Sequence, residues 1–174
     1  MQFSCLISSD MPLLVWRGCA PPKIKFLAWL ILQDSVWTAD RLQRWGRPNY
    51  GTCKLCNQEP ETAAHLLFKC RFTARVWSLL KGWLDLHHIF PRTWTAWDSV
   101  KDWWIGFLDM YGTQRMAMGS LIMLTSWNIW TERNARVCRN EYASPSSIMA
   151  KIKVEAKNWG LVGAKHLSAI MSGE

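Results

Sequence analysis

Four residues in a short stretch carry the side chains that zinc prefers: Cys53, Cys56, His65 and Cys70. Structural zinc sites take four ligands in a tetrahedron, and thiolate sulfur and imidazole nitrogen are common among them. A C-x-x-C pair lets two thiolates reach one ion from a tight turn. We predict one bound Zn²⁺. Because protein ligands fill all four positions, no position is left for a catalytic water, and the ion should be structural.

The spacing between His65 and Cys70 constrains the chain between them. On an unbroken α-helix, residues five apart lie about 140° apart around the axis, so the two side chains could not reach one ion. We therefore predict that the helix carrying His65 ends before Cys70 and that a new helix begins just beyond it. Lys54 and Lys69 stand next to ligands, where they would offset the net negative charge of three thiolates on a divalent ion.

The other cysteines, Cys5, Cys19 and Cys138, are scattered along the chain. Disulfide frameworks are typical of small secreted proteins. The first residues include no basic region, and the apolar run over residues 11–16 is too short for a signal peptide. We expect an intracellular location, nuclear or cytoplasmic, and no secretion.

The periodicity of apolar residues is helical almost throughout, and no segment shows strong alternation between hairpin turns. Pro22 and Pro145 suit the first turn of a helix, and Thr38 and Ser144 suit the cap before one. Helices are expected over residues 21–33, 39–45, 60–69, 72–86, 97–110, 113–140 and 145–167. The apolar stretch over residues 116–130 is shorter than the roughly 20 residues of a membrane span. It predicts a buried core helix, so we expect no contact with a membrane.

The predicted fold class is all-α: a helical bundle with a CCHC zinc-binding turn between helices, and room for a minimal β-ribbon at the zinc. A loop expected over residues 87–95 suggests two lobes. Residues 1–90 would form an N-terminal helical lobe with the zinc motif, its core at about 16–86. Residues 91–174 would form a C-terminal helical hairpin or bundle packed on it.

Composition leaves two questions open. The chain contains 13 Trp, and indole rings suit either a bulky core or a surface that stacks on flat partners. The net charge of +8 favours attraction to nucleic acid, although the basic residues form no long run.

Several motifs in order resemble a known family. They are PKIKFLAWL at 22–30, TADRL at 38–42, the C-x-x-C pair, ETAAHLLFKC at 61–70 and VW at 76–77. Together they resemble the zinc-binding domain that follows the reverse transcriptase in plant non-LTR (LINE-type) retrotransposons. The run WNIWTERNARV at 127–137 resembles the tail of the same reading frames. Asn57 stands where the family usually has Gly, but Asn tolerates the left-handed conformation that this turn needs. Cys138 replaces a usual aromatic residue, and we do not expect it to be a ligand.

The resemblance implies a domain downstream of a polymerase that helps the enzyme to hold nucleic acid. The chain itself has no paired-Asp polymerase motif and no set of acidic residues typical of a two-metal nuclease site. We therefore expect no enzymatic activity and no small-molecule substrate. The pair His87-His88 is expected to be a surface pair.

Two hypotheses remain for the partner. One is a nucleic-acid-binding zinc module that contacts RNA or DNA through basic residues, with the last three of them forming a basic face on one helix. These candidates are Arg41, Arg44, Arg47, Lys54, Lys69, Arg71, Arg75, Arg133, Arg136 and Arg139. The other is a retroelement fragment adopted by its host, binding a host protein through exposed Trp or Met, which are favoured in interface centres.

Overall fold

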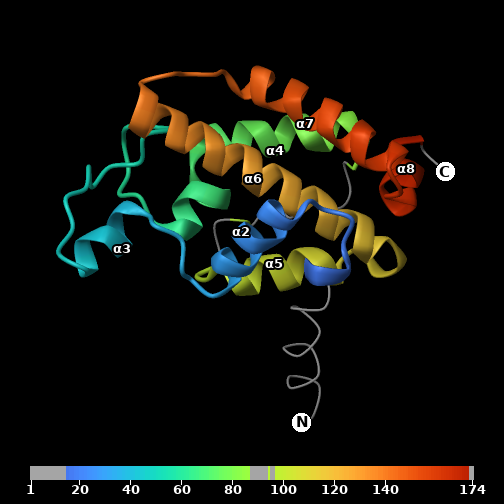
Figure 1. The fold of residues 1–174 in the computed structure, drawn as a ribbon, viewed down its shortest axis with the longest axis horizontal. Helices are drawn as coiled ribbons and strands as arrows, with labels where there is room; N and C mark the ends of the chain where they lie inside the picture. The colour runs from blue at the N-terminus through green and yellow to red at the C-terminus, as the bar shows by residue number, and fades with distance from the viewer. Residues whose placement is uncertain (1–14, 87–93, 95–96, 173–174) are drawn as a thin grey trace, which may run out of the picture.

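The computed structural model describes residues 15–86, 94 and 97–172 (Figure 1). Helices account for most of these residues, as the all-α prediction requires, and no extended strand occurs among them. The helices are α2 (Pro22–Leu32), α3 (Ala39–Arg44), η1 (His65–Lys69), α4 (Arg71–Trp83), α5 (Val100–Asp109), η3 (Gly112–Gln114), α6 (Arg115–Arg139), α7 (Pro145–Leu161) and α8 (Lys165–Ser172).

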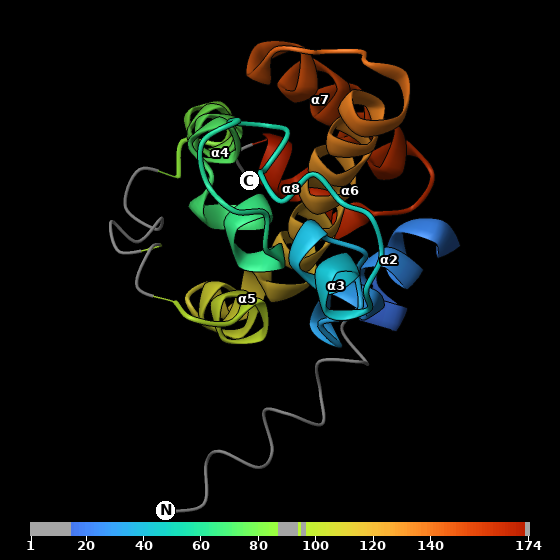
Figure 2. The same ribbon diagram turned by 90° about the vertical axis from the view of Figure 1, so that its left-hand side faces the viewer.

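The long helix α6 lies at the centre of the molecule. It contacts α2 and α5 on one side and α7 and α8 on the other, while α4 packs against α7 (Figures 1 and 2). Every residue from 117 to 126 is buried, which is expected of a helix that is apolar on all sides. This confirms the predicted core helix. No described helix is long and apolar enough to cross a membrane.

An aromatic cluster joins the two halves of the sequence. Phe68 stacks on Trp103 with ring centroids 4.9 Å apart, and Trp77 meets Trp94 and Trp103 edge-on. These buried side chains belong to one hydrophobic core that spans the boundary expected near residue 90. Tryptophan side chains lie both in the core and on the surface. Five described Trp are buried, whereas Trp16, Trp29, Trp37 and Trp45 are exposed.

Of the two N-caps predicted at Thr38 and Ser144, one is formed by its side chain. The Ser144 hydroxyl accepts a hydrogen bond from the Ser147 amide, as expected for an N-cap. The Thr38 hydroxyl instead donates to the Asp40 carboxylate at 2.6 Å and caps no amide. The single helix expected over residues 145–167 was wrong, because Gly163 takes a left-handed φ of 119° and separates α7 from α8. The loop expected over residues 87–95 falls almost entirely outside the described residues, as does the pair His87-His88.

Candidate metal centre

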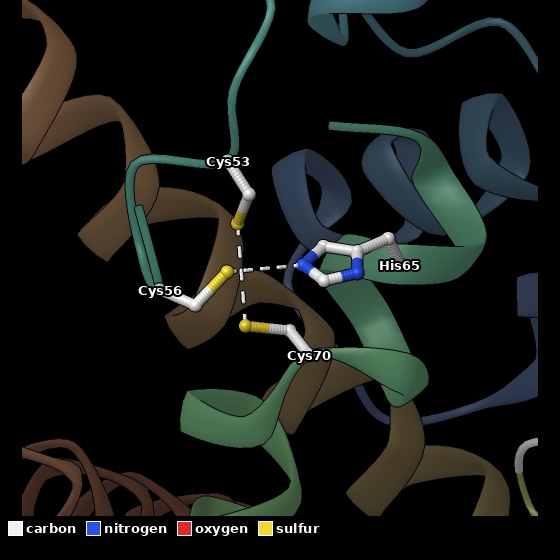
Figure 3. Close-up of side chains that lie close together, drawn as sticks. All are labelled: Cys53, Cys56, His65 and Cys70. Carbon is white, nitrogen blue, oxygen red and sulfur yellow. Dashed lines mark hydrogen bonds between the residues drawn. The ribbon is translucent and has the colours of Figure 1, made fainter. Parts of the chain in front are cut away.

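The four predicted ligands come together in one cluster (Figure 3). Their ligand atoms all lie within 4.8 Å of one another. The Sγ atoms of Cys53 and Cys70 are 4.0 Å apart, and the Cys56 Sγ is 3.3 Å from the His65 Nε2. Zn–S bonds of about 2.3 Å in a tetrahedron place two sulfurs about 3.8 Å apart, and the shorter Zn–N bond brings sulfur and nitrogen to about 3.6 Å. The donor set and its spacing therefore fit one tetrahedral Zn²⁺.

The first two ligands lie on a tight knuckle that the backbone closes. The Asn57 amide donates to the Cys53 carbonyl at 2.7 Å, and Asn57 adopts a left-handed φ of 54°. This is the conformation that we expected Asn to tolerate in place of Gly. The Cys53 amide in turn donates to the Glu59 carbonyl, and Thr52 and Pro60 form a single antiparallel bridge. The minimal β-ribbon at the zinc is thus one bridge long.

The other two ligands lie at the ends of a π-helical turn. Residues 65–69 form η1, and the Cys70 amide donates to the His65 carbonyl at 2.7 Å, five residues back. This wider turn returns residue i+5 to the side of residue i. Cys70 itself is extended, and α4 begins at Arg71. The predicted helix break is confirmed. The widening before it was not foreseen, because the 140° argument assumed α-helical geometry.

Side chains of α4 satisfy the backbone at this break. The Thr73 hydroxyl donates to the Leu66 carbonyl at 2.7 Å, and the Trp77 indole donates to the Leu67 carbonyl at 2.9 Å. Both side chains are buried, where an unpaired carbonyl would be costly. Trp77 therefore both fills the core and holds the turn that carries His65 and Cys70.

Protons and Zn²⁺ compete for this cluster. A hydrogen bond from the Cys53 thiol lowers the pKa of Cys70 to about 4. The same hydrogen bond, together with burial, raises the pKa of Cys53. Hydrogen bonds to Cys70 and Cys56 raise the pKa of His65. A metal that binds here competes with protons for the same atoms, since zinc takes thiolates and neutral imidazole.

Glu61 ties the loop from Cys53 to His65, which we call the zinc loop, to two helices. Its carboxylate, 1% exposed, accepts hydrogen bonds from the guanidinium of Arg133 on α6 and from the Ala39 amide at the start of α3. Its own amide donates to the Gly51 carbonyl, and its carbonyl accepts from the Asp40 amide. Glu61 therefore connects this loop to α6 through its side chain and to α3 through its side chain and backbone.

Arg136 on α6 holds the knuckle itself. Its guanidinium donates to the carbonyls of Lys54 and Leu55, the two residues between Cys53 and Cys56, at 3.1 and 3.0 Å. A carboxylate oxygen of Glu132 accepts from the same guanidinium at 2.8 Å and also from the Ala143 amide. The planar fork of Arg suits such multiple donation.

Residues 6–77 match the family described as zinc-binding in reverse transcriptase. This segment is a reverse-transcriptase zinc-binding domain. No curated protein and no solved structure matches the chain. The matched segment includes all four ligands and Trp77, but it ends well before Arg133 and Arg136. The structure thus shows that the zinc-binding domain is completed by a helix outside the matched segment.

The expected basic face on α6 is not formed. Arg133 and Arg136 are 9% and 8% exposed at their side chains, and both are paired with buried carboxylates. Only Arg139 of the three is exposed, where it pairs with Glu141. The spacing of three residues suggested a shared face, but packing against the zinc loop buries two of the three cations. Arg133 and Arg136 instead make structural contacts. The four-residue spacing of Glu132 and Arg136, which is typical of an ion pair within a helix, could have indicated this for Arg136.

The remaining candidate cations lie around the zinc-binding domain. Arg44 pairs with Asp40 and approaches Asp34, and Arg41 donates to the Asp34 carbonyl. Lys54 and Lys69 lie over the rings of Tyr50 and Phe68. Arg47, Arg71 and Arg75 are exposed. Cys19 and Cys138 are exposed free thiols apart from the cluster.

Proposed function

We propose that this chain is a non-catalytic accessory module, derived from a plant non-LTR retrotransposon reverse transcriptase, that holds RNA or DNA in the nucleus or cytoplasm. The zinc fixes its shape, and the cations around the zinc-binding domain contact phosphates. Zinc here is structural because its four positions are filled by protein ligands.

One observation carries the proposal: the candidate cations divide into paired and unpaired groups. Within the described part of the chain, Arg47, Lys54, Lys69, Arg71 and Arg75 form no ion pair with a carboxylate. Arg71 directly follows Cys70, and Arg75 lies one helical turn further along α4. A cation without an internal carboxylate partner is available to neutralise a phosphate and release its counterions.

Two observations support the proposal that the chain is non-catalytic. The matched family is a zinc-binding domain and not the polymerase itself. Two-metal nucleotidyl chemistry needs clustered carboxylates. Among the described residues, the Cys53–Cys56–His65–Cys70 group is the one cluster of three or more metal-binding side chains.

The test is the salt dependence of binding, measured by fluorescence anisotropy with labelled oligonucleotides and the zinc-loaded chain. We expect the affinity to fall steeply between about 50 and 200 mM salt. Arg71→Gln with Arg75→Gln should weaken binding and reduce the salt slope by about 0.7–0.9 for each phosphate that the variant no longer neutralises. Arg139→Gln, whose cation is already paired with Glu141, is the control. Failure to bind single-stranded or duplex RNA or DNA at about 50 mM salt would contradict the proposal.

A host-protein partner is the second candidate, favoured by one apolar patch. Leu161 and Val162 at the end of α7 are 85% and 83% exposed, which is unusual for neighbouring aliphatic side chains. If this function holds, a host protein should copurify with the wild-type chain and be lost with Leu161→Lys and Val162→Lys. Copurification that survives both substitutions would argue against this surface.

A further inference from the structure

The segment over residues 37–54, which we call the α3 arm, carries three strongly exposed aromatic rings. It consists of Trp37, the cap residue Thr38, α3, the loop that follows α3, and Cys53 with Lys54. Trp45, Tyr50 and Trp37 are 66%, 61% and 53% exposed. The arm lies at the end of the molecule that faces the viewer in Figure 2. Folding normally buries such rings, so three of them on one short arm require an explanation.

Two of the three rings on the α3 arm lie against a cation, and the third has cations beside it in the sequence. The Lys54 Nζ is 4.2 Å from the centroid of the Tyr50 ring, and the Arg41 guanidinium is 5.7 Å from that of Trp37. Trp45 stands between Arg44 and Arg47 in the sequence. The arm contains four cations against one carboxylate, that of Asp40. The combination is thus flat apolar faces in a positive field.

The arm is held firmly at its base. Leu42, Tyr50 and Lys54 line a small cavity of about 110 Å³ together with the buried residues Glu61 and Arg133. The Arg47 amide donates to the Leu42 carbonyl, and the Gly51 amide donates to the Asn49 side chain. The loop after α3 therefore closes through its own hydrogen bonds, and both ends of the arm are joined to Glu61 through Ala39, Asp40 and Gly51.

The exposed rings on α2 differ from those of the arm. Phe26 and Trp29 stack on each other with centroids 6.0 Å apart, and neither is among the rings that a described cation covers. They stack on each other, whereas Trp37 and Tyr50 of the arm each lie against a cation, Arg41 and Lys54. The two surfaces therefore suit different partners, and the α2 pair serves as a control.

We propose that the α3 arm binds single-stranded nucleic acid by stacking unpaired bases on Trp45 and Tyr50 while its cations contact the phosphates. Alternating aromatic and basic side chains match the alternation of base and phosphate along a strand. In a duplex the base faces are covered by their neighbours, so the rings would have nothing to stack on. The inference rests on the proposed function and names its ligand class: a single strand, without a fixed sequence.

The experiment measures the affinity of the zinc-loaded full chain for a labelled single strand of DNA of about 20 nucleotides, the same sequence as RNA, and the corresponding duplex. We expect either single strand to bind at least about tenfold more tightly than the duplex. Trp45→Ala and Tyr50→Ala should each lower single-strand affinity roughly fivefold to a hundredfold, the range found for one stacked base. Trp45→Phe should retain most of the affinity. Matched controls on other exposed rings, Trp16→Ala and Phe26→Ala, should stay close to wild type.

The outcomes separate the two claims. If the Arg71 and Arg75 substitutions weaken binding but Trp45→Ala and Tyr50→Ala do not, the chain binds nucleic acid and the stacking arm is wrong. Equal affinity for single strand and duplex also overturns the arm. If no oligonucleotide binds at low salt, the proposed function itself fails. Because the varied rings are exposed, zinc content and circular dichroism should be unchanged in these variants. A variant that loses either is replaced by the Leu variant at the same position, which keeps apolar bulk but removes the flat aromatic face.

Discussion

The carboxylate of Glu61 receives the Arg133 guanidinium although the two residues lie 72 positions apart in the chain. The Arg133 Nε is 3.1 and 3.0 Å from the two carboxylate oxygens, and both side chains are buried. The pair joins the loop between Cys56 and His65 to the central helix α6. The zinc-binding domain is therefore not an independent finger but one face of the bundle.

Breaking this pair should destabilise the whole fold. Arg133→Met leaves a buried carboxylate without its cation, which costs about 3–5 kcal/mol in comparable cases. Urea denaturation followed by circular dichroism gives the free energy of unfolding. The double variant Glu61→Gln/Arg133→Met should be less destabilised than the two single losses added together. Additive losses would mean that the pair does not act as a unit. The control is Arg139→Met, which removes the exposed pair with Glu141 and should cost less than about 1 kcal/mol.

Cysteine substitutions should distinguish ligands from bystanders. Cys56→Ser removes a thiolate that zinc needs, so the protein should purify with less than one zinc per chain and unfold at a lower temperature. Cys138→Ser, at an exposed free thiol, should keep one zinc per chain. Elemental analysis and thermal melts measure both properties. Chelation of the wild-type protein should reproduce the Cys56→Ser melt, and melts unchanged by both treatments would rule out structural zinc.

Arg136→Lys should weaken zinc binding without touching a ligand. The three N–H donors of lysine lie on one nitrogen, so they cannot reach the Lys54, Leu55 and Ala143 carbonyls and Glu132 together, as the spread guanidinium of Arg136 does. Substitution of outer-shell partners typically lowers metal affinity about 10–100-fold. Competition with a chromophoric chelator measures this affinity. Arg139→Lys is the control, and an Arg136→Lys affinity equal to that of wild type would mean that the knuckle keeps its shape unaided.

Tyr111 should make stability sensitive to alkaline pH. Burial raises the pKa of its phenol, and its hydroxyl has no hydrogen-bond partner among the described residues. The folded state favours the neutral phenol. The contribution of Tyr111 to the free energy of unfolding is therefore complete below the unfolded pKa of about 10 and is lost as pH rises above it. Tyr111→Phe should abolish that part of the loss and be neutral or stabilising near neutral pH. Denaturation midpoints between about pH 7 and 11 test this, and identical profiles for both proteins would contradict it.

The local features of the metal centre were readable from the sequence. The four ligands and the break before Cys70 follow from spacing and residue type over a few positions, and the left-handed turn at Asn57 was expected from the family resemblance. The π-helical form of the break was not readable, since it depends on Thr73 and Trp77 reaching back from the next helix to the Leu66 and Leu67 carbonyls.

The sequence by itself determined which residues can bind zinc and that the chain is helical, because ligand chemistry and hydrophobic periodicity belong to short contiguous segments. Only the tertiary structure decided what the charges on α6 do. Periodicity placed Arg133 and Arg136 on a helix but could not tell which face would be buried, and packing against the zinc loop made them partners of Glu61 and of the Cys53–Cys56 knuckle. The exposed rings of the α3 arm were equally undecided, since a tryptophan in the sequence is core or surface only once its neighbours are in place.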